Sequence, residues 1–236
     1  MKASIVIPAY NEEASIEHAL RAALAQDHDD FEVIVVNNAS ADRTVEIVSQ
    51  FPVKLVHESR KGLLWAREAG RKAAQGDVIA NMDADCRPQP DWLSRGLKHF
   101  NDERIVAVTG PYDYHDATRR SFRMSSLLTQ RYIYKPVSVI LQLPFINGGA
   151  ILIGGNNLIR AHILEKTSGY NTDLAFYGED TDTAKRVARH GTVLFNTSFI
   201  MKTSARRYER EGILNLQMKY LFHFFKHIFK KKTASA

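Results

Sequence analysis

Short apolar runs alternate with amphipathic segments along the first half of the chain. The apolar runs predict strands at residues 4–8, 31–36, 53–57, 77–82 and 105–109. The segments between them predict helices at residues 16–24, 42–51, 62–74 and 92–100, of which the first is opened by Glu12 and Glu13. Buried runs that alternate with helices of this length predict an α/β fold, with a mostly parallel twisted sheet flanked by helices.

The second half of the chain is less regular. We expect a helix at residues 119–134, a second at 179–190 and a strand at 192–195. Between the first two lies the charge-free stretch 136–159, which prolines, glycines and asparagines interrupt too often for a membrane-spanning helix. It is interpreted as buried strand and loop, or as a surface that dips toward lipid. With no linker-like break and no repeat, residues 1–210 are expected to form a single compact domain, and residues 211–236 a tail.

The excess of positive over negative charge lies at the C-terminal end of the chain. The net charge is +6, yet residues 201–236 hold nine Lys or Arg against two Glu, so the rest of the chain is almost neutral. The single cysteine, Cys86, excludes an intrachain disulfide framework and a cysteine-rich zinc site. The first residues do not have the pattern of a secretory signal, and we expect a cytoplasmic protein.

Polar residues follow the predicted strands at their carboxyl ends, where ligands bind to parallel sheets. Asp83 and Asp85 come directly after the strand at 77–82. One carboxylate can bind a hard cation such as Mg²⁺ and the other can contact a sugar hydroxyl. Two acids in a solvated turn remain the alternative, because a D-x-D pair alone is a weak signal.

A second acidic group, Glu179-Asp180-Thr181-Asp182, opens the predicted helix at 179–190. Acids at a helix N-terminus are favourable on electrostatic grounds alone, with Asp180 as the cap. The functional interpretation is that one of these carboxylates is a general base. Position alone does not separate the two.

Taken together, five ordered segments resemble glycosyltransferase family 2. They are residues 5–13 (IVIPAYNEE), 35–44 (VVNNASADRT), 61–70 (KGLLWAREAG), 83–85 (DAD) and 178–182 (GEDTD). The resemblance implies the GT-A fold, with a nucleotide-sugar-binding half at residues 1–110 and an acceptor half at 111–210. It implies a non-processive enzyme that transfers a sugar from a nucleotide donor to an acceptor hydroxyl with inversion, using Mg²⁺ or Mn²⁺.

The resemblance also implies a role for each matching residue. Asp180 matches the catalytic base, Asp85 the metal ligand and Asp83 the acid that contacts the ribose. The other donor-binding positions are Pro8, Tyr10, Glu12, Asn37, Arg67, Arg206 and Arg207. Among these, Arg67 matches a basic residue near the base or phosphates, and the two later arginines are expected to help hold the pyrophosphate.

The chain departs from the family pattern in three places. Asn37 stands where many members have an acid, and an amide both donates and accepts hydrogen bonds, so the donor base is left open. We expect a UDP-sugar, with GDP- and dTDP-sugars as alternatives. The Q-x-x-R-W motif of the processive synthases is missing. His190 is the nearest candidate for a third metal ligand, against the simpler interpretation of a structural histidine at a helix end.

The tail predicts an amphipathic helix from Gly212 onward. One stripe is apolar and the other is basic, with Leu214, Met218, Leu221, Phe225 and Ile228 on the first and Lys219, His223, Lys226 and Lys230 on the second. Such a helix can lie in the headgroup layer of an anionic membrane, which would place the protein at the inner face and suit a lipid-linked acceptor, with a glycan acceptor as the other expectation. Alternatively, the apolar stripe packs on the domain.

Other classes of protein are also compatible with parts of the sequence. A nucleic-acid-binding module would use the basic tail, with Tyr220, Phe222 and Phe224 as stacking groups, but it leaves the nearly neutral remainder without a role. We therefore expect no nucleic acid partner. A catalytically silent membrane adaptor would keep the fold and bind no nucleotide sugar. A nucleotidyltransferase is disfavoured because no G-x-G-x-R phosphate loop follows the first strand.

Overall fold

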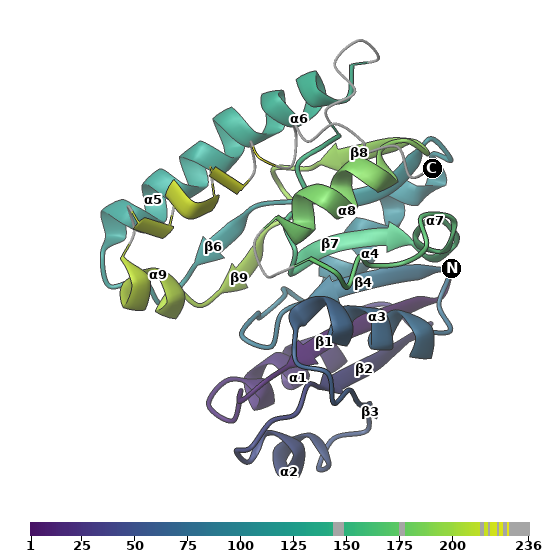
Figure 1. Cartoon of the computed structure of the whole chain (residues 1–236), viewed down its shortest axis with the longest axis vertical. Coiled ribbons are helices and arrows are strands. Elements are labelled where there is room, and N and C mark those ends of the chain that lie inside the picture. The colour runs from purple at the N-terminus through teal and green to yellow at the C-terminus, as the bar shows by residue number, and fades with distance from the viewer. Residues whose placement is uncertain are drawn as a thin grey trace.

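A central mixed sheet organises the fold in the computed structural model (Figure 1). The structure describes residues 1–143, 149–174, 178–212, 215, 216, 218–220, 222, 223 and 226. Within these residues the sheet has seven strands: β1 (Ala3–Ala9), β2 (Phe31–Asn37), β3 (Lys54–His57), β4 (Val78–Met82), β5 (Ile105–Thr109), β7 (Asn156–Arg160) and β8 (Thr192–Phe195). Their order is β3-β2-β1-β4-β7-β5-β8, and β7 alone among them runs antiparallel to its two neighbours. The mostly parallel sheet expected from the sequence is confirmed.

Helices cover both faces of the sheet. Along β1, Ile5 and Ile7 face one apolar core while Val6 faces the other, because successive side chains of a strand point to opposite sides. The first core is closed by α1 (Ile16–Leu24), α2 (Thr44–Val48) and α4 (Trp92–Leu97), the second by α3 (Leu63–Ala73), α7 (Ala161–Lys166) and α8 (Glu179–Val187). The 3-10 helix η1 (Lys98–Asn101) continues α4.

α1 covers the predicted residues 16–24, but the two acids that were expected to open it lie outside the helix. α1 starts at Ile16, and Glu12 and Glu13 remain in the loop before it. The reason is tertiary: the Glu12 side chain pairs with Arg206, and the Glu13 carboxylate accepts a hydrogen bond from the Arg43 backbone N–H at 3.1 Å. The expectation that these acids open the helix was therefore wrong.

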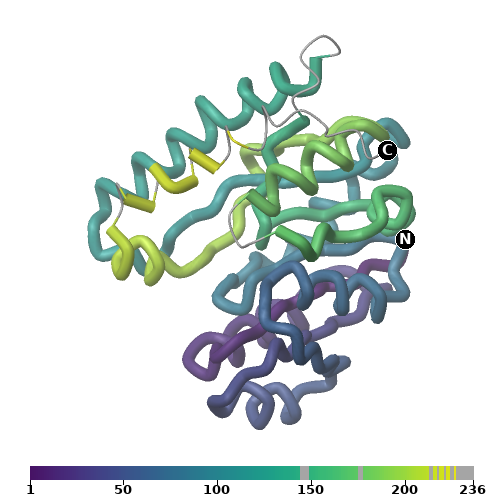
Figure 2. Tube along the Cα trace, in the orientation of Figure 1, coloured from purple at the N-terminus to yellow at the C-terminus, as the bar shows by residue number. Residues whose placement is uncertain are grey.

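A second layer extends from one end of the sheet. It contains the parallel pair β6 (Tyr112–Tyr114) and β9 (Met201–Thr203) and the helices α5 (Arg120–Thr129), η2 (Gln130–Tyr134, a π-helical turn), α6 (Lys135–Leu141) and α9 (Arg206–Glu211). The tube in Figure 2 shows α5, η2 and α6 as one continuous rod along the outer edge of the molecule. The rod is longer than the helix predicted at 119–134.

The described residues of the charge-free stretch 136–159 belong to α6, to β7 and to the irregular segments at 142–143 and 149–155. The last residues of the stretch are buried in the sheet, as the interpretation of buried strand and loop expects. Across the described residues, we find no helix with both the length and the apolar character needed to span a bilayer.

The tail is helical at the residues that the structure describes between 215 and 226. Leu216 is fully buried, whereas Met218 and Phe222 are exposed. The Lys219 Nζ lies 3.1 Å from the Glu211 carboxylate. Much of the predicted two-stripe pattern lies outside the described residues, namely Leu214, Leu221, Phe225, Ile228 and Lys230.

Candidate active site

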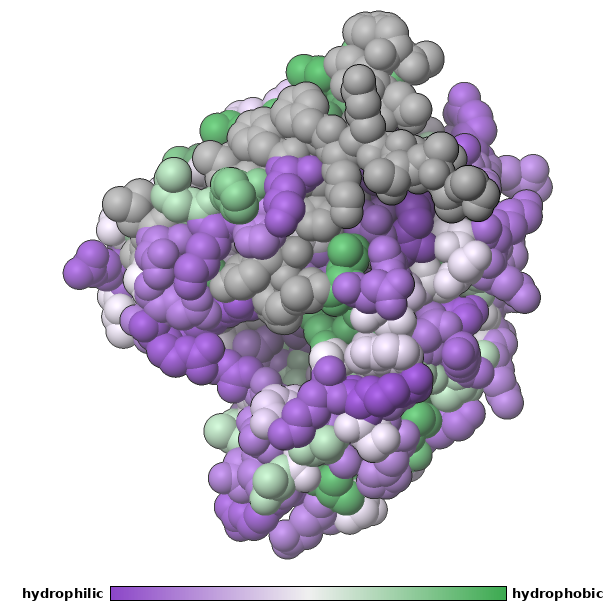
Figure 3. Space-filling model, in the orientation of Figure 1, coloured by the Kyte–Doolittle hydropathy of each residue, from purple (hydrophilic) through white to green (hydrophobic). Residues whose placement is uncertain are grey.

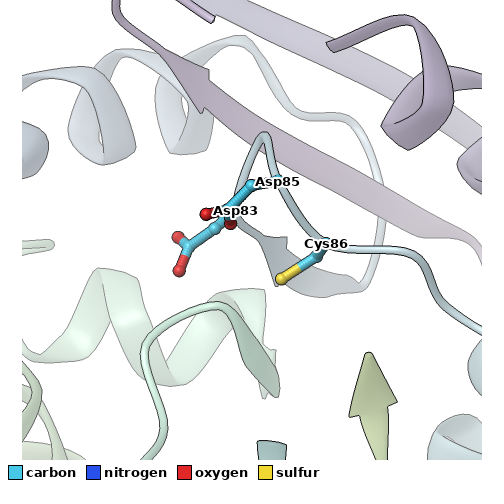
Figure 4. Close-up of side chains that lie close together, drawn as sticks. All are labelled: Asp83, Asp85 and Cys86. Atoms are coloured by element: carbon cyan, nitrogen blue, oxygen red, sulfur yellow. The ribbon is translucent and has the colours of Figure 1, made fainter. Parts of the chain in front are cut away.

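Two aspartates occupy the turn that follows β4, at the carboxyl edge of the sheet (Figure 4). Oxygen atoms of Asp83 and Asp85 and the sulfur of Cys86 all lie within 4.8 Å of one another. The thiol is a poor candidate ligand because burial, followed by the two neighbouring carboxylates, raises its pKa well above the usual value. Hard carboxylate oxygens are the donors that Mg²⁺ and Mn²⁺ prefer. The two aspartates therefore fit the cation that the sequence implied.

The electrostatics around Asp85 also fit a cation. Burial raises its pKa to about 6, and the charge of Asp83 acts in the same direction, while Arg206 opposes both. The Arg206 Nε lies 3.5 Å from an Asp85 oxygen, and the same guanidinium pairs with Glu12. Thr203 donates its hydroxyl to Asp85 at 3.3 Å. More negative than positive charge thus gathers here, which is the condition that a divalent ion relieves.

Arg67 links the aspartates after β4 to the start of α8. Its side chain extends from α3, is 5% exposed and places Nη1 3.1 Å from Asp180 and Nη2 3.5 Å from Asp83. Burial alone would lower the pKa of this guanidinium, but the two carboxylates raise it, so the group stays charged. The residues predicted as donor contact, ribose contact and base are therefore brought together although they are far apart in sequence.

Asp180 is held in this cluster rather than used as a helix cap. The N-cap of α8 is Gly178, whose φ of 94° is a conformation that glycine adopts without strain. The Asp180 carboxylate accepts the backbone N–H of Gly154 at 3.0 Å as well as Arg67. Burial raises the pKa of Asp180, and Arg67 counteracts it. The interpretation of Asp180 as a simple cap is wrong.

Tyr112 and the Gly154-Gly155 turn are site residues that the motifs did not reveal. The Tyr112 hydroxyl donates to Asp83 at 2.9 Å and accepts the Gly155 N–H at 2.8 Å. A Cβ atom on Gly155 would lie 2.2 Å from an Asp83 oxygen. The turn can approach the carboxylates only because it has no side chains. The pair of glycines in an uncharged run was the available signal.

The loops after β1 and β2 place the remaining predicted donor residues. Pro8 lies within β1 beside Val36, and Tyr10 projects beyond the strand end, half-exposed, with the Lys61 ammonium 5.3 Å from its ring centre. Asn37 is buried, with its amide nitrogen 3.2 Å from the His57 ring and its oxygen accepting the Ser40 N–H at 3.1 Å. These residues line the same carboxyl edge as Asp83.

The remaining candidates are Arg207, in α9, and His190. The Arg207 Nε pairs with Glu211 at 3.1 Å, and its guanidinium lies 5.8 Å from the centre of the Tyr220 ring. It is Arg206 that contacts Asp85. His190 is exposed after the end of α8, and the potential metal-binding group found among the described residues does not include it.

Glu179 precedes Asp180 and is 6% exposed. Burial, reinforced by the charge of Asp180, raises its pKa to about 8, from 4.5 for an ordinary glutamate. Between pH 4.5 and pH 8, Glu179 is protonated in the folded protein and ionised in the unfolded chain. The free energy of unfolding therefore falls as the pH rises through this range. At pH 8 the free energy of unfolding of Glu179→Gln is expected to exceed that of the wild type by about 1 kcal/mol or more. Below pH 4.5 the two free energies should be equal.

Urea unfolding of both proteins across this pH range measures the effect. Glu165→Gln, at an exposed glutamate of α7, is the matched control and should follow the wild-type curve. A wild-type and a Glu179→Gln curve that run parallel at all pH values would show that Glu179 does not keep its proton.

Comparison with known proteins defines the class of this site. The fold is that of GT-A glycosyltransferases. A mannosyltransferase from Pyrobaculum calidifontis, solved with GDP-Man and Mn²⁺, superposes with a TM-score of 0.73 at 23% identity, over 98% of this chain and 65% of the other. Glucosyl-3-phosphoglycerate synthase from Mycobacterium tuberculosis, solved with Mg²⁺ and UDP, gives 0.66 at 19% identity, over 98% and 81%.

The chain belongs to glycosyltransferase family 2. The model of that family, described as "Glycosyl transferase family 2", matches residues 4–168. The probable glycosyltransferase YdaM of Bacillus subtilis is 35% identical over 211 residues, which are 80% of this chain and 47% of YdaM. Glycosyltransferase AglE of Haloferax volcanii is 33% identical over 119 residues, 47% of this chain and 39% of AglE. The chain thus spans about half or less of the length of these relatives, and the predicted family is confirmed.

Proposed function

We propose that the chain transfers a sugar from a nucleoside-diphosphate donor to an acceptor hydroxyl, with inversion at the sugar carbon. The observation that carries the proposal is the cluster in which Arg67 joins Asp83 and Asp180, beside Asp85. It combines, at one edge of the sheet, oxygen ligands for a cation, the fixed positive charge of Arg67, and the Asp180 carboxylate, whose pKa is raised by burial and lowered by Arg67. These three components suffice for transfer with inversion.

Asp180 would accept the proton of the acceptor hydroxyl. A general base is most effective when its pKa lies near the working pH, and burial and Arg67 act on this carboxylate in opposite directions. The hydrogen bond from Gly154 fixes one of its oxygens, so the carboxylate is held in one orientation. This is the arrangement expected of a base that receives a proton at a defined position.

Asp85 would hold Mg²⁺ or Mn²⁺, while Asp83 would contact the donor ribose. A bound divalent cation supplies positive charge to the diphosphate that leaves. Arg206 places a second positive charge beside Asp85 and is the better candidate of the two arginines for the pyrophosphate. Arg207 would support it from α9.

The proposal leaves three choices for the nucleotide base of the sugar donor. Pro8, Tyr10, Glu12 and Asn37 would surround the nucleoside. The two solved neighbours described above hold GDP-Man and UDP, so both a UDP- and a GDP-sugar agree with the fold, and dTDP-sugars are a third choice. The acceptor would be a glycan or a lipid-linked molecule, with the protein bound peripherally to the inner face of a membrane.

Asp85→Asn is expected to weaken Mn²⁺ binding at least about tenfold in the presence of a nucleoside diphosphate, because a charged oxygen ligand is lost. Electron paramagnetic resonance of free Mn²⁺ measures this affinity without requiring turnover. Asp91→Asn, which changes a surface aspartate paired with Arg95, should bind Mn²⁺ as the wild type does. Equal affinities for all three proteins would remove Asp85 as the metal ligand.

A further inference from the structure

Exposed apolar side chains are concentrated on the rod formed by α5, η2 and α6. The described residues include thirteen large hydrophobic side chains that are exposed. Six of these belong to the rod, and a seventh, Leu143, follows directly after it. We call six of them the outer face: Met124, Leu128, Tyr132, Ile133, Val139 and Ile140. Figure 3 shows apolar surface along the upper left rim, where Figure 1 places these helices.

The opposite side of the rod is fixed to the domain. Phe122, Gln130, Ser138 and Leu141 are buried, at spacings that bring them to one side of the rod. The Gln130 amide accepts the Tyr112 N–H at 2.8 Å and donates to the Tyr112 carbonyl at 3.0 Å. The rod therefore cannot rotate to bury the outer face without breaking its attachment to β6. Exposed apolar patches of this kind mark a contact with a partner or a membrane.

The charged residues of the rod itself are all positive, and the acids near its start, Asp113 and Glu209, contact Arg123 and the Thr118 backbone N–H. Residues 117–164 contain no Asp or Glu. Arg120, Arg131 and Lys135 are exposed on the rod, and the Arg131 guanidinium lies 5.7 Å from the centre of the Tyr132 ring. Apolar side chains bordered by the cations of the same helices complement a surface that is apolar inside and negative outside. An anionic lipid bilayer has this structure.

We propose that the outer face of the α5–η2–α6 rod docks on an anionic membrane. The side chains of the outer face enter the headgroup layer, and the three exposed cations contact lipid phosphates. The buried side of the rod contacts Tyr112, whose hydroxyl reaches Asp83, so about one helix diameter of 10–12 Å separates the bilayer from the strand that borders the site. Docking on the membrane does not depend on the proposed function. Only the consequence that a lipid-linked acceptor would lie within reach of the site rests on it.

The experiment is sedimentation of the full chain with phosphatidylcholine vesicles, with and without phosphatidylglycerol. Ile140→Glu should lower the affinity for anionic vesicles about tenfold or more, whereas Ile200→Glu, the same change at an exposed isoleucine before β9, should leave it unchanged. Lys135→Glu should lower it about fivefold, and Lys166→Glu, in α7, should not. Thermal unfolding verifies that each variant is folded.

Several results would overturn the docking face. The docking face would be refuted if the wild-type protein did not bind anionic vesicles. It would also be refuted if Ile140→Glu and Ile200→Glu bound these vesicles with equal affinity. A loss confined to Phe222→Glu would assign the contact to the tail instead, and a dimer that only Ile140→Glu dissociates would assign the face to a second copy of the chain. Binding of Mn²⁺ and nucleoside diphosphate is measured on the same samples, because its absence with intact vesicle binding would refute the proposed function alone.

Discussion

Replacing Asp180 by asparagine is expected to lower the rate of sugar transfer about 10²- to 10⁴-fold while leaving donor affinity within about tenfold. The amide keeps the size of the side chain and can still accept the Gly154 N–H, but it cannot take a proton. A loss of rate without a loss of donor binding is the signature of a missing base. Initial rates and calorimetric titration of the donor measure the two quantities.

Asp182→Asn provides the control for this experiment. Asp182 lies in the same first turn of α8, but its carboxylate pairs with Arg186 at 2.8 Å rather than with Arg67. This variant should keep close to the wild-type rate. If Asp180→Asn retained the rate, or if both variants lost it equally, Asp180 would not be the base.

Arg67→Met is expected to lower the free energy of unfolding by about 3 kcal/mol near pH 8. The substitution removes a buried cation that faces two carboxylates. Because Asp83 and Asp180 are each about one third exposed, water screens part of their repulsion, which places the loss at the lower end of the range for broken buried pairs. The loss should shrink as the pH falls and the carboxylates of the variant take up protons.

The pH dependence separates charge from packing in this variant. Without Arg67 the pKa of Asp180 rises further, so the acid limb of the rate profile should move to higher pH. Arg71→Met, one turn further along α3, breaks the pair with Glu68 and tests the loss of a more exposed arginine in the same helix. It should cost less stability and leave the rate profile in place. An equal loss in both variants, independent of pH, would contradict the role assigned to Arg67.

The sequence was sufficient to predict the parts of the site that follow strands. Asp83 and Asp85 were expected at the sheet edge because parallel strands end there together, whereas the role of Asp180 as a base was implied by its motif alone and stays a prediction. The alternation of strands and helices predicted the sheet itself. The predictions of the sheet and of the two aspartates at its edge succeeded because each depends on local pattern and on a general rule of α/β topology.

The missed features depend on contacts between distant residues. Tyr112 belongs to a strand of three residues, too short for a periodic signal, and it reaches Asp83 across 29 positions of the chain. The role of Gly155 appears only when Asp83 and Tyr112 are beside it. Hydropathy alone could not identify β7 as an antiparallel strand, because a buried strand has the same apolar pattern in either direction.

The rod illustrates a different reason for a missed boundary. The helix was predicted to end at Tyr134, and Pro136 follows two residues later. Proline interrupts the hydrogen bonds of a helix interior. Pro136 instead lies in the first turn of α6, directly after the π-helical turn η2, where the missing N–H is tolerated. Local backbone geometry of this kind is not contained in the pattern of apolar residues.

The roles proposed for Asp83, Asp85 and Arg206 all require that the acidic edge of the sheet binds a nucleoside diphosphate through a divalent cation. Calorimetric titration of the wild-type chain with UDP, GDP and dTDP, in Mn²⁺ and again in excess EDTA, tests it most directly. We predict that at least one nucleotide binds with Mn²⁺ and that its affinity falls at least about tenfold in EDTA. Failure of all three nucleotides to bind, or binding that is unchanged in EDTA, would contradict the claim.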